Sequence, residues 1–172
     1  MEIPILSLML LVSLVGAVVT FFLGKNPKMA KMSALVFSAI PMLLSLYMLT
    51  QYVQTGGGYQ FKESFTWIES LGISYILGVD GISVPMVFLS TLLVFLAVIF
   101  SWDVDHRTNQ FMALLLVLEL GVLGVFMALD YFLFYVFWEV VLIPMYFLIS
   151  VWGGPRRAYS AIKFFIYTHI AS

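Results

Sequence analysis

The sequence predicts an all-α integral membrane protein with five complete transmembrane spans and the start of a sixth. Of its 172 residues, 63% are hydrophobic and only 10% are charged, a composition far outside the range of soluble proteins. The apolar residues form runs of about 20, the length that crosses ~30 Å of hydrocarbon as a helix. The charged residues gather in the connections between these runs. Together these observations favour a helical bundle embedded in a lipid bilayer.

The predicted spans follow one another in a single transmembrane domain. They cover residues 3–23, 32–53, 81–102, 110–129, 131–150 and, for the incomplete sixth, 158–172. The first run is preceded by Glu2 rather than by a basic residue and is too long for a signal-peptide core, so we expect it to be retained. The sixth has 15 residues, short of the ~20 that a span needs. We therefore expect the chain to be the amino-terminal part of a longer subunit.

Residues 54–80 form the long polar connection of the chain. Apolar side chains alternate with polar ones there, at Tyr59, Phe61, Phe65 and Trp67, which predicts a short strand or a hairpin. A belt of aromatic side chains at the membrane interface, around Trp67 and Tyr75, explains the same pattern equally well. A turn at residues 78–81 follows, and either Asp80 or Ser83 is expected to cap the third helix.

The basic residues of the connections divide unequally between the two sides of the bundle. One side carries Lys25, Lys28, Lys31, Arg107, Arg156 and Arg157, and the other carries Lys62. The positive-inside rule then predicts that the amino terminus and residues 54–80 face the outside.

Several function classes are excluded by composition. The chain has no cysteine, which removes disulfides, cysteine-ligated iron–sulfur clusters and thiol catalysis. Its two histidines lie far apart in sequence, so a metal site has little to build from. A net charge of −1 gives no basic footprint for nucleic acid, and no glycine-rich nucleotide loop occurs. We therefore predict no cofactor, no metal and no nucleic-acid partner on this chain.

One carboxylate, Glu139, interrupts the apolar run of the fifth span near its middle. An ionised acid at that depth costs at least ~2.5 to 3.5 kcal/mol, so it must be protonated, paired, or facing water or protein. Pro144 lacks an N–H and leaves the carbonyl of Val140 without its helical hydrogen bond. This pattern predicts that Glu139 is a proton relay, with a protonated packing residue as the alternative.

Glu119, in the fourth span, is the second buried acid. It lies 11 residues before Asp130 and Glu139 lies 9 residues after it, so their depths differ by ~3 Å at ~1.5 Å per residue. If the helices turn the two acids toward each other, they titrate as a pair. If the acids face apart, each needs its own partner. A hydrogen-bonded packing residue is an equally good interpretation of Glu119.

Two further titratable residues lie in the sixth run. Lys163 is expected to reach back to the inner interface, and a role as proton relay is the lesser alternative. His169 lies deeper, on one helical face with Ile162, Phe165 and Ile166. A buried neutral histidine bonded to a neighbouring helix and a place in a proton path are equally supported.

The run LDYFLFYVFWEVVLIPMYFLISVWGG, followed by AIKFFIYT, closely resembles the proton-pumping membrane subunit M of bacterial NADH:quinone oxidoreductase, respiratory complex I, called subunit 4 in mitochondria. LGVDGIS resembles the entry to the third span of the same family, and the elements FWE, IPM and WGG fall in the family's order and spacing. The resemblance covers residues 77–168, and residues 1–76 fit by span count alone. It implies an antiporter-like helix bundle.

The resemblance also implies a function and its partners. In that family a glutamate at the position of Glu139 pairs with a lysine on the seventh span. Glu119 resembles the family's second acid, on the fourth span. The present chain ends at Ser172, before the position of that lysine. A proton-translocating membrane-arm subunit without a redox centre is implied, with NADH, flavin, iron–sulfur clusters and quinone on partner subunits. Ferredoxin and a reduced deazaflavin are alternative electron donors. A bacterial or archaeal plasma membrane is expected, with the mitochondrial inner and thylakoid membranes as alternatives.

Two other functions stay open at the level of sequence. Multi-chain cation/proton antiporters contain membrane subunits that resemble this family closely, and Glu139 alone does not separate them. A non-pumping fragment with a structural role would leave proton movement unaffected by the substitution Glu139→Gln.

Overall fold

The computed structural model describes residues 4–23, 25–52 and 58–172 of the chain. Its elements are α1 (Ile5–Phe22), α2 (Pro27–Gln51), β1 (Gln60–Ile68), the short 3-10 helix η1 (Glu69–Leu71), β2 (Ile73–Val79), α3 (Ser83–Phe100), α4 (Thr108–Met127), α5 (Tyr131–Trp152) and α6 (Arg157–Ala171). Residues 3 and 53, at predicted span ends, and residues 54–57 of the polar connection lie outside the described part.

The helices α1 to α5 are long and apolar enough to cross a membrane. Their outer faces carry large apolar side chains that no other part of the described chain covers, among them Leu11, Leu43, Leu93 and Ile143. Exposed apolar surface on this scale is stable against lipid and not against water. The predicted fold class, a helical membrane bundle with five spans and a sixth helix, is therefore confirmed, and the protein is a multi-pass integral membrane protein.

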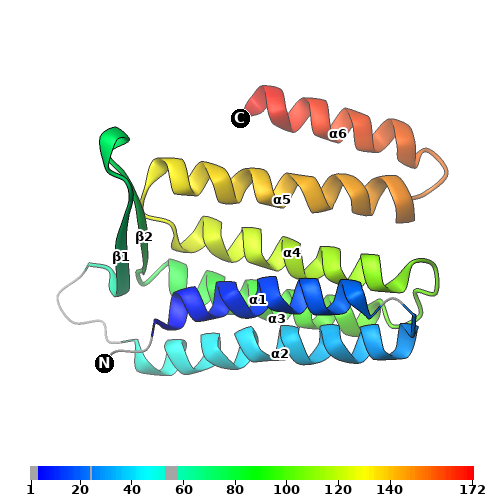
Figure 1. Ribbon diagram of the computed structural model, residues 1–172, viewed down its shortest axis with the longest axis horizontal. Helices are drawn as coiled ribbons and strands as arrows, with labels where there is room; N and C mark the ends of the chain where they lie inside the picture. The colour runs from blue at the N-terminus through cyan, green and yellow to red at the C-terminus, as the bar shows by residue number, and fades with distance from the viewer. Residues whose placement is uncertain (1–3, 24, 53–57) are drawn as a thin grey trace.

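Helix α4 is the central element of the bundle, because it packs against α1, α2, α3 and α5. Helix α5 lies between α4 and α6, so α6 is on the outside of the bundle (Figure 1). The glycines of α4 allow α5 to approach closely. A Cβ atom on Gly124 would lie 2.1 Å from the ring of Phe137, and one on Gly121 would lie 2.8 Å from Cγ2 of Val141.

Helix α2 begins at Pro27, whereas the sequence predicts a loop up to Lys31. Asn26 caps this helix, since its side-chain oxygen accepts hydrogen bonds from the backbone N–H groups of Lys28 and Met29. Proline at the first helical position needs no hydrogen bond of its own and has a backbone angle suited to the helix. The cap and the proline therefore extend the helix toward α1, so Lys28 and Lys31 lie in its first turns rather than in a loop.

The strands β1 and β2 form an antiparallel hairpin across one end of the bundle (Figure 1). The left-handed residue Gly72, with φ of 66°, closes its turn. The hairpin alternative is thus confirmed for residues 58–80, the described part of the polar connection, while Trp67 and Tyr75 still lie at that end. The backbone N–H of Leu129 donates to the carbonyl of Ile76 at 2.9 Å, and the hydroxyls of Ser7 and Tyr75 are 2.8 Å apart.

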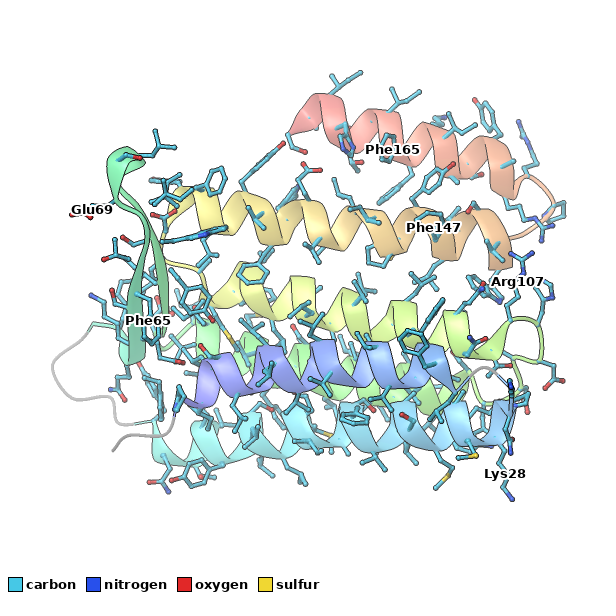
Figure 2. The ribbon with its side chains drawn as sticks, in the orientation of Figure 1. Lys28, Phe65, Glu69, Arg107, Phe147 and Phe165 are labelled. Atoms are coloured by element: carbon cyan, nitrogen blue, oxygen red, sulfur yellow. The ribbon has the colours of Figure 1, made fainter. Side chains whose placement is uncertain are left out.

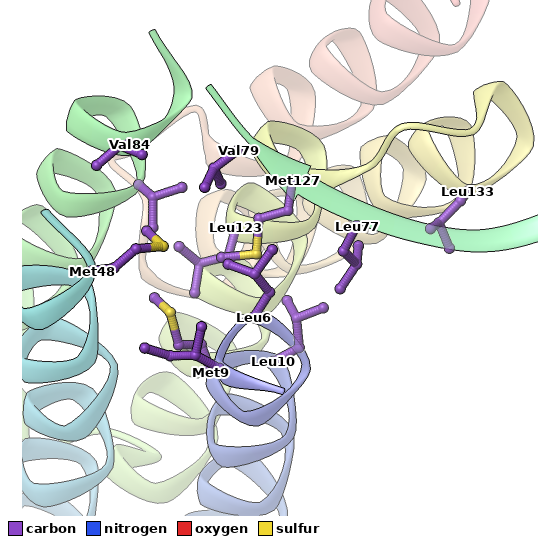
Figure 3. Packing of buried hydrophobic residues seen from close by; sticks show 12 residues of the cluster. Leu6, Met9, Leu10, Met48, Leu77, Val79, Val84, Leu123, Met127 and Leu133 are labelled. Carbon is purple, nitrogen blue, oxygen red and sulfur yellow. The ribbon is translucent and has the colours of Figure 1, made fainter. Parts of the chain in front are cut away.

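The core at the hairpin end joins the strand β2 to all of the spanning helices (Figure 3). Its fully or nearly buried side chains include Leu6, Met9, Met48, Leu77, Val84, Leu123, Met127 and Leu133. Asp80 accepts hydrogen bonds from the N–H groups of Ile82 and Ser83, at 2.9 and 2.8 Å, and so leads the chain from β2 into α3. This core fixes the ends of α4 and α5 relative to the hairpin.

The opposite end of the bundle collects the basic residues. Lys28 and Arg107 lie there, while Phe65 and Glu69 lie at the hairpin end (Figure 2). The Nζ atom of Lys31 is 3.6 Å from a carboxylate oxygen of Asp105, which ties the start of α2 to the α3–α4 connection. The indole N–H of Trp152 donates to the carbonyl of His106 at 2.8 Å.

Candidate functional site

The start of α5 is fixed by Asp130. Its Oδ1 atom accepts hydrogen bonds from the N–H groups of Phe132 and Leu133, at 2.9 and 3.1 Å, and its Oδ2 atom accepts one from Ser74 of β2 at 3.3 Å. The hydrogen bond from Leu133, followed by those from Ser74 and Phe132, lowers the pKa of the Asp130 carboxyl. Asp130 therefore caps α5 and joins it to the hairpin, and so fixes the height at which Glu139 lies.

Glu139 pairs with His169 across the α5–α6 interface. The Oε2 atom of Glu139 is 3.1 Å from Nε2 of His169, and the two side chains are 22% and 39% exposed. The other oxygen of Glu139, Oε1, is buried and has no hydrogen-bond partner among the described residues. The phenol of Tyr135, four residues earlier on α5, lies close enough to interact with the charge of Glu139.

The imidazole of His169 is oriented by its own helix. Its Nδ1 atom is 3.1 Å from the backbone carbonyl oxygen of Phe165, and its ring lies 4.1 Å from the ring of Phe165. The ring of Phe165 also contacts Tyr146 of α5, with a centroid distance of 5.5 Å. His169 is thus bonded to a neighbouring helix, as the first of the two interpretations requires, but its side chain is not fully buried.

Glu119 is fully buried and has its partner on α1. The hydroxyl of Ser13 is 3.2 Å from Oε1 of Glu119 and 3.1 Å from the carbonyl of Met9. The second oxygen, Oε2, has no hydrogen-bond partner in the described part of the chain. Ser13 was not predicted from the sequence, because nothing in the apolar run of α1 distinguishes it from the other small residues of that helix.

The two acids face away from each other. In an α-helix a residue two positions away lies ~200° around the axis. Phe137 and Val141, on either side of Glu139, face α4, and Gly121, two residues after Glu119, faces α5. Glu139 therefore points toward α6 and Glu119 toward α1. Of the two arrangements that the sequence left open, the structure has the one in which each acid has its own partner.

Lys163 lies on the exposed side of α6. Its Nζ atom is 5.8 Å from the ring centroid of Tyr159, over which the guanidinium of Arg156 also lies at 5.2 Å. These residues line a groove of about 370 Å³ near the start of the helix. Tyr159 precedes Lys163 on α6, so the side chain reaches back toward the basic end of the bundle, in the direction expected of a lysine that reaches for the interface.

Metal ligands are not grouped in the described residues. No three side chains of histidine, cysteine, aspartate or glutamate there are close enough together to hold a metal ion. The titratable side chains described above, namely two carboxyl groups that face different helices, a histidine and a phenol, can all carry protons.

The pairing of Glu139 with His169 had a signal in the sequence that was not used. Both residues are 15 positions from Gly154, in the turn between the two helices. Antiparallel helices joined by a short turn place residues equally far from the turn at the same height. Counting residues from the turn is the same method that compares the depths of Glu119 and Glu139 around Asp130. Applied around Gly154, it would have predicted equal depths for Glu139 and His169.

Comparison with known proteins gives consistent matches. A family model described as NADH:quinone oxidoreductase/Mrp antiporter, TM, matches residues 128–172. The chain is 40% identical, over 98% of its length, to F(420)H(2) dehydrogenase subunit M of Methanosarcina mazei, of which it covers 34%. It is 45% identical, over 83% of its length, to NADH-quinone oxidoreductase subunit M of Rhodobacter capsulatus, of which it covers 28%.

A solved structure has the same fold. The chain superimposes on a chain of respiratory complex I from Thermus thermophilus with a TM-score of 0.81 and 26% identity, over 98% of the present chain and 33% of the other. The chain thus spans about a third of the length of these relatives.

Proposed function

Starting from the homology of this chain to the amino-terminal third of subunit M of complex I-type quinone oxidoreductases, we propose that it is a proton-translocating subunit of the membrane arm of such an enzyme. Electrons would pass from NADH or a related donor to quinone on partner subunits, which would hold the flavin and the iron–sulfur clusters. The other membrane-arm subunits would be its neighbours in the bilayer. This chain would move protons without redox chemistry of its own.

The pairing of Glu139 with His169 is the observation that supports this proposal best. Glu139 lies near the middle of a helix long enough to span the membrane, and its carboxylate contacts a second titratable group at 3.1 Å. Moving one charge through the membrane is worth ~2.3 kcal/mol per 100 mV, so a protonatable group halfway across divides that work into smaller steps. Glu139 is the proposed proton relay.

Glu119 is the second proposed station for protons. It is buried against α1, and its Oε2 atom has no hydrogen-bond partner among the described residues. Oε2 could therefore accept a hydrogen bond from a donor outside the described residues. Lys163 has a lesser proposed role, because its amine lies over Tyr159 near the start of α6. It would supply positive charge where protons enter or leave at the basic end.

The orientation follows from the basic residues. Lys28 and Arg107 lie at the end of the bundle opposite to the hairpin, and the positive-inside rule assigns such an end to the cytoplasm or its equivalent. The amino terminus and the hairpin would then face the outside, in a bacterial or archaeal plasma membrane.

A cation/proton antiporter subunit is the second candidate, because the description of the matching family model names Mrp antiporters together with the oxidoreductase. The two functions differ in what drives transport. Proton movement that needs an electron donor and quinone supports the oxidoreductase, whereas sodium-dependent proton exchange without any donor supports the antiporter.

The substitution Glu139→Gln tests the proposal. Membrane vesicles would be prepared from cells whose own gene carries the substitution, and proton uptake would be measured with a pH-sensitive dye while quinone reduction is followed in parallel. We expect Glu139→Gln to lower the number of protons moved per electron. Glu69→Gln, the same chemical change on the exposed turn of the hairpin, serves as the matched control. Proton uptake at the control rate in Glu139→Gln would refute the proposal.

A further inference from the structure

The tautomer of His169 is fixed by its contact with the backbone. Nδ1 lies 3.1 Å from the carbonyl oxygen of Phe165, and a carbonyl oxygen only accepts hydrogen bonds. Nδ1 must therefore carry the hydrogen. In neutral His169 the nitrogen that faces Glu139 is then an unprotonated Nε2 with a free lone pair. The ring of Phe165 packs against the imidazole in this orientation, with 4.1 Å between the ring centroids and 31° between the ring planes.

The contact between Nε2 and Oε2 then depends on the number of protons present. A hydrogen bond at 3.1 Å needs one proton between the two atoms. A protonated Glu139 donates to neutral His169, or a protonated His169 donates to ionised Glu139. With two protons the imidazolium N–H can still donate to the carbonyl oxygen of the protonated acid, whereas with none both atoms are acceptors and the hydrogen bond is lost. The pair is therefore bonded while it holds at least one proton and separates when it holds none.

We infer that Glu139 and His169 act as a proton-transfer pair, in which Glu139 passes its proton to Nε2 of His169 and loss of the last proton releases the contact between α5 and α6. In the transfer the O–H bond of Glu139 breaks and the lone pair of Nε2 forms the new N–H bond. The total charge of the pair does not change. This inference rests on the proposed relay role of Glu139 and adds the acceptor and the direction of transfer, toward α6.

Among the described residues, few titratable groups compete with the pair. Helix α4 presents Gly121 and Gly124 to α5, and its acid Glu119 faces α1. On α6 the amine of Lys163 lies over Tyr159. On α5 the phenol of Tyr135 is the titratable group beside the carboxylate. Strand β2 contacts α5 near its start, where the described acid is Asp130. His169 is thus the acceptor that the described residues offer to Glu139.

Release of the pair has a structural consequence because, among the described residues, α6 packs chiefly against α5. Along this interface the polar contact of Glu139 with His169 accompanies the ring contact of Tyr146 with Phe165. Loss of the polar contact leaves the aromatic contact in place, so the protonation of the pair sets how closely α5 and α6 approach each other at Glu139 and His169.

The test uses His169→Gln in membrane vesicles that carry the native complex. Glutamine can donate or accept a hydrogen bond but cannot take up a proton. We expect coupled proton uptake to fall at least ~10-fold, since a positioned acid–base group contributes ~10²–10⁴-fold to a proton transfer. His169→Lys, which restores a protonatable nitrogen, should recover part of it. His106→Gln is the matched control, because Trp152 bonds to the backbone carbonyl of His106 and that carbonyl is kept.

Infrared difference spectroscopy gives a second readout, which is taken on the unsubstituted complex once the bands are assigned. The carboxyl band of Glu139 is assigned by its loss in Glu139→Gln, and the imidazole band by nitrogen-15 labelling of histidine. In the unsubstituted complex both bands should shift together in the step of a pH titration that removes the last proton, because that step breaks the hydrogen bond that joins the two groups. A shift of one band without the other in that step, or equal proton uptake in His169→Gln and His106→Gln, would overturn the inference. Uptake that survives Glu139→Gln would instead refute the relay itself.

Discussion

Replacing Gly124 by alanine places a methyl group against the ring of Phe137, and this is the sharpest test of how α4 and α5 pack. A Cβ atom at Gly124 would lie 2.1 Å from Cγ and Cδ1 of that ring and 2.5 Å from Cδ2. Carbon atoms in ordinary contact are ~3.5 Å apart or more, so the ring must retreat by ~1.4 Å. Phe137 lies on α5 only two residues from Glu139, so the displacement reaches the proposed proton relay.

The expected cost follows from overpacking. Forcing one methyl group into a close-packed interface typically costs ~1–3 kcal/mol, and the direction in which Phe137 can move is limited because its ring lies between two helices. We therefore expect Gly124→Ala to lower the free energy of unfolding by that amount. The same displacement should lengthen the contact of Glu139 with His169 and reduce coupled proton uptake.

The assay is denaturant unfolding of the purified protein in detergent micelles, followed by circular dichroism. Gly154→Ala is the matched control: a Cβ atom there meets nothing within 4 Å, so the change should stay within ~0.5 kcal/mol of the parent. Phe137→Leu removes part of the ring that Gly124→Ala would strike. The double variant should be more stable than the sum of the two single changes predicts.

The reasoning is refuted if Gly124→Ala unfolds at the same denaturant concentration as Gly154→Ala. It is equally refuted if the two single changes at Gly124 and Phe137 are additive, because additive effects mean that the methyl group and the ring do not meet.

Three further predictions concern other parts of the molecule. Ser13→Ala should cost ~1–3 kcal/mol in unfolding experiments, because Glu119 loses its described hydrogen-bond partner; Ser90→Ala, which removes a similar bond to the helix backbone without an acid nearby, should cost less. The pKa of Asp130 is lowered in the folded protein, so its contribution to the free energy of unfolding should be complete above the pKa of ~3.9 that it has in the unfolded chain. That contribution should be lost as the pH falls through the pKa of the folded protein. Asp130→Asn should remove this acid dependence of the unfolding midpoint. Asp105→Asn should change the unfolding free energy by less than ~1 kcal/mol, because this carboxylate is 92% exposed in its pair with Lys31.

Hydropathy was sufficient to predict the bundle, because a helix that faces lipid must be apolar over its whole length. The alternation around Phe65 and Trp67 was sufficient to predict the hairpin as one of two alternatives, but not to choose it. The choice depends on partners far away in sequence, namely the N–H of Leu129 and the hydroxyl of Ser7. The family resemblance read from the FWE, IPM and WGG elements is confirmed by the matches to subunit M of related enzymes.

The partners of the two acids were harder to predict, because hydropathy says little about the direction in which a residue faces in a helix that is apolar all round. Helix α4 shows the difficulty, since it is buried against four neighbours and has no polar face. A different signal was present: Gly121 and Gly124 lie on one side of α4, and small residues on one helix face allow a neighbour to approach. Reading those glycines as the α5 contact would have turned Glu119 toward another helix.

The packing of α4 against α5 also bears on how protons could move. Between Glu119 and Glu139 lie the contacts of Gly121 with Val141 and of Gly124 with Phe137, which leave no room even for a methyl group. A chain of water molecules through this interface would need space that these contacts fill. In the proposed relay each acid would therefore exchange protons with its own surroundings, Glu119 on the α1 side and Glu139 through His169 on the α6 side. Gly124→Ala and His169→Gln should accordingly affect the Glu139 side while leaving the hydrogen bond of Ser13 with Glu119 in place.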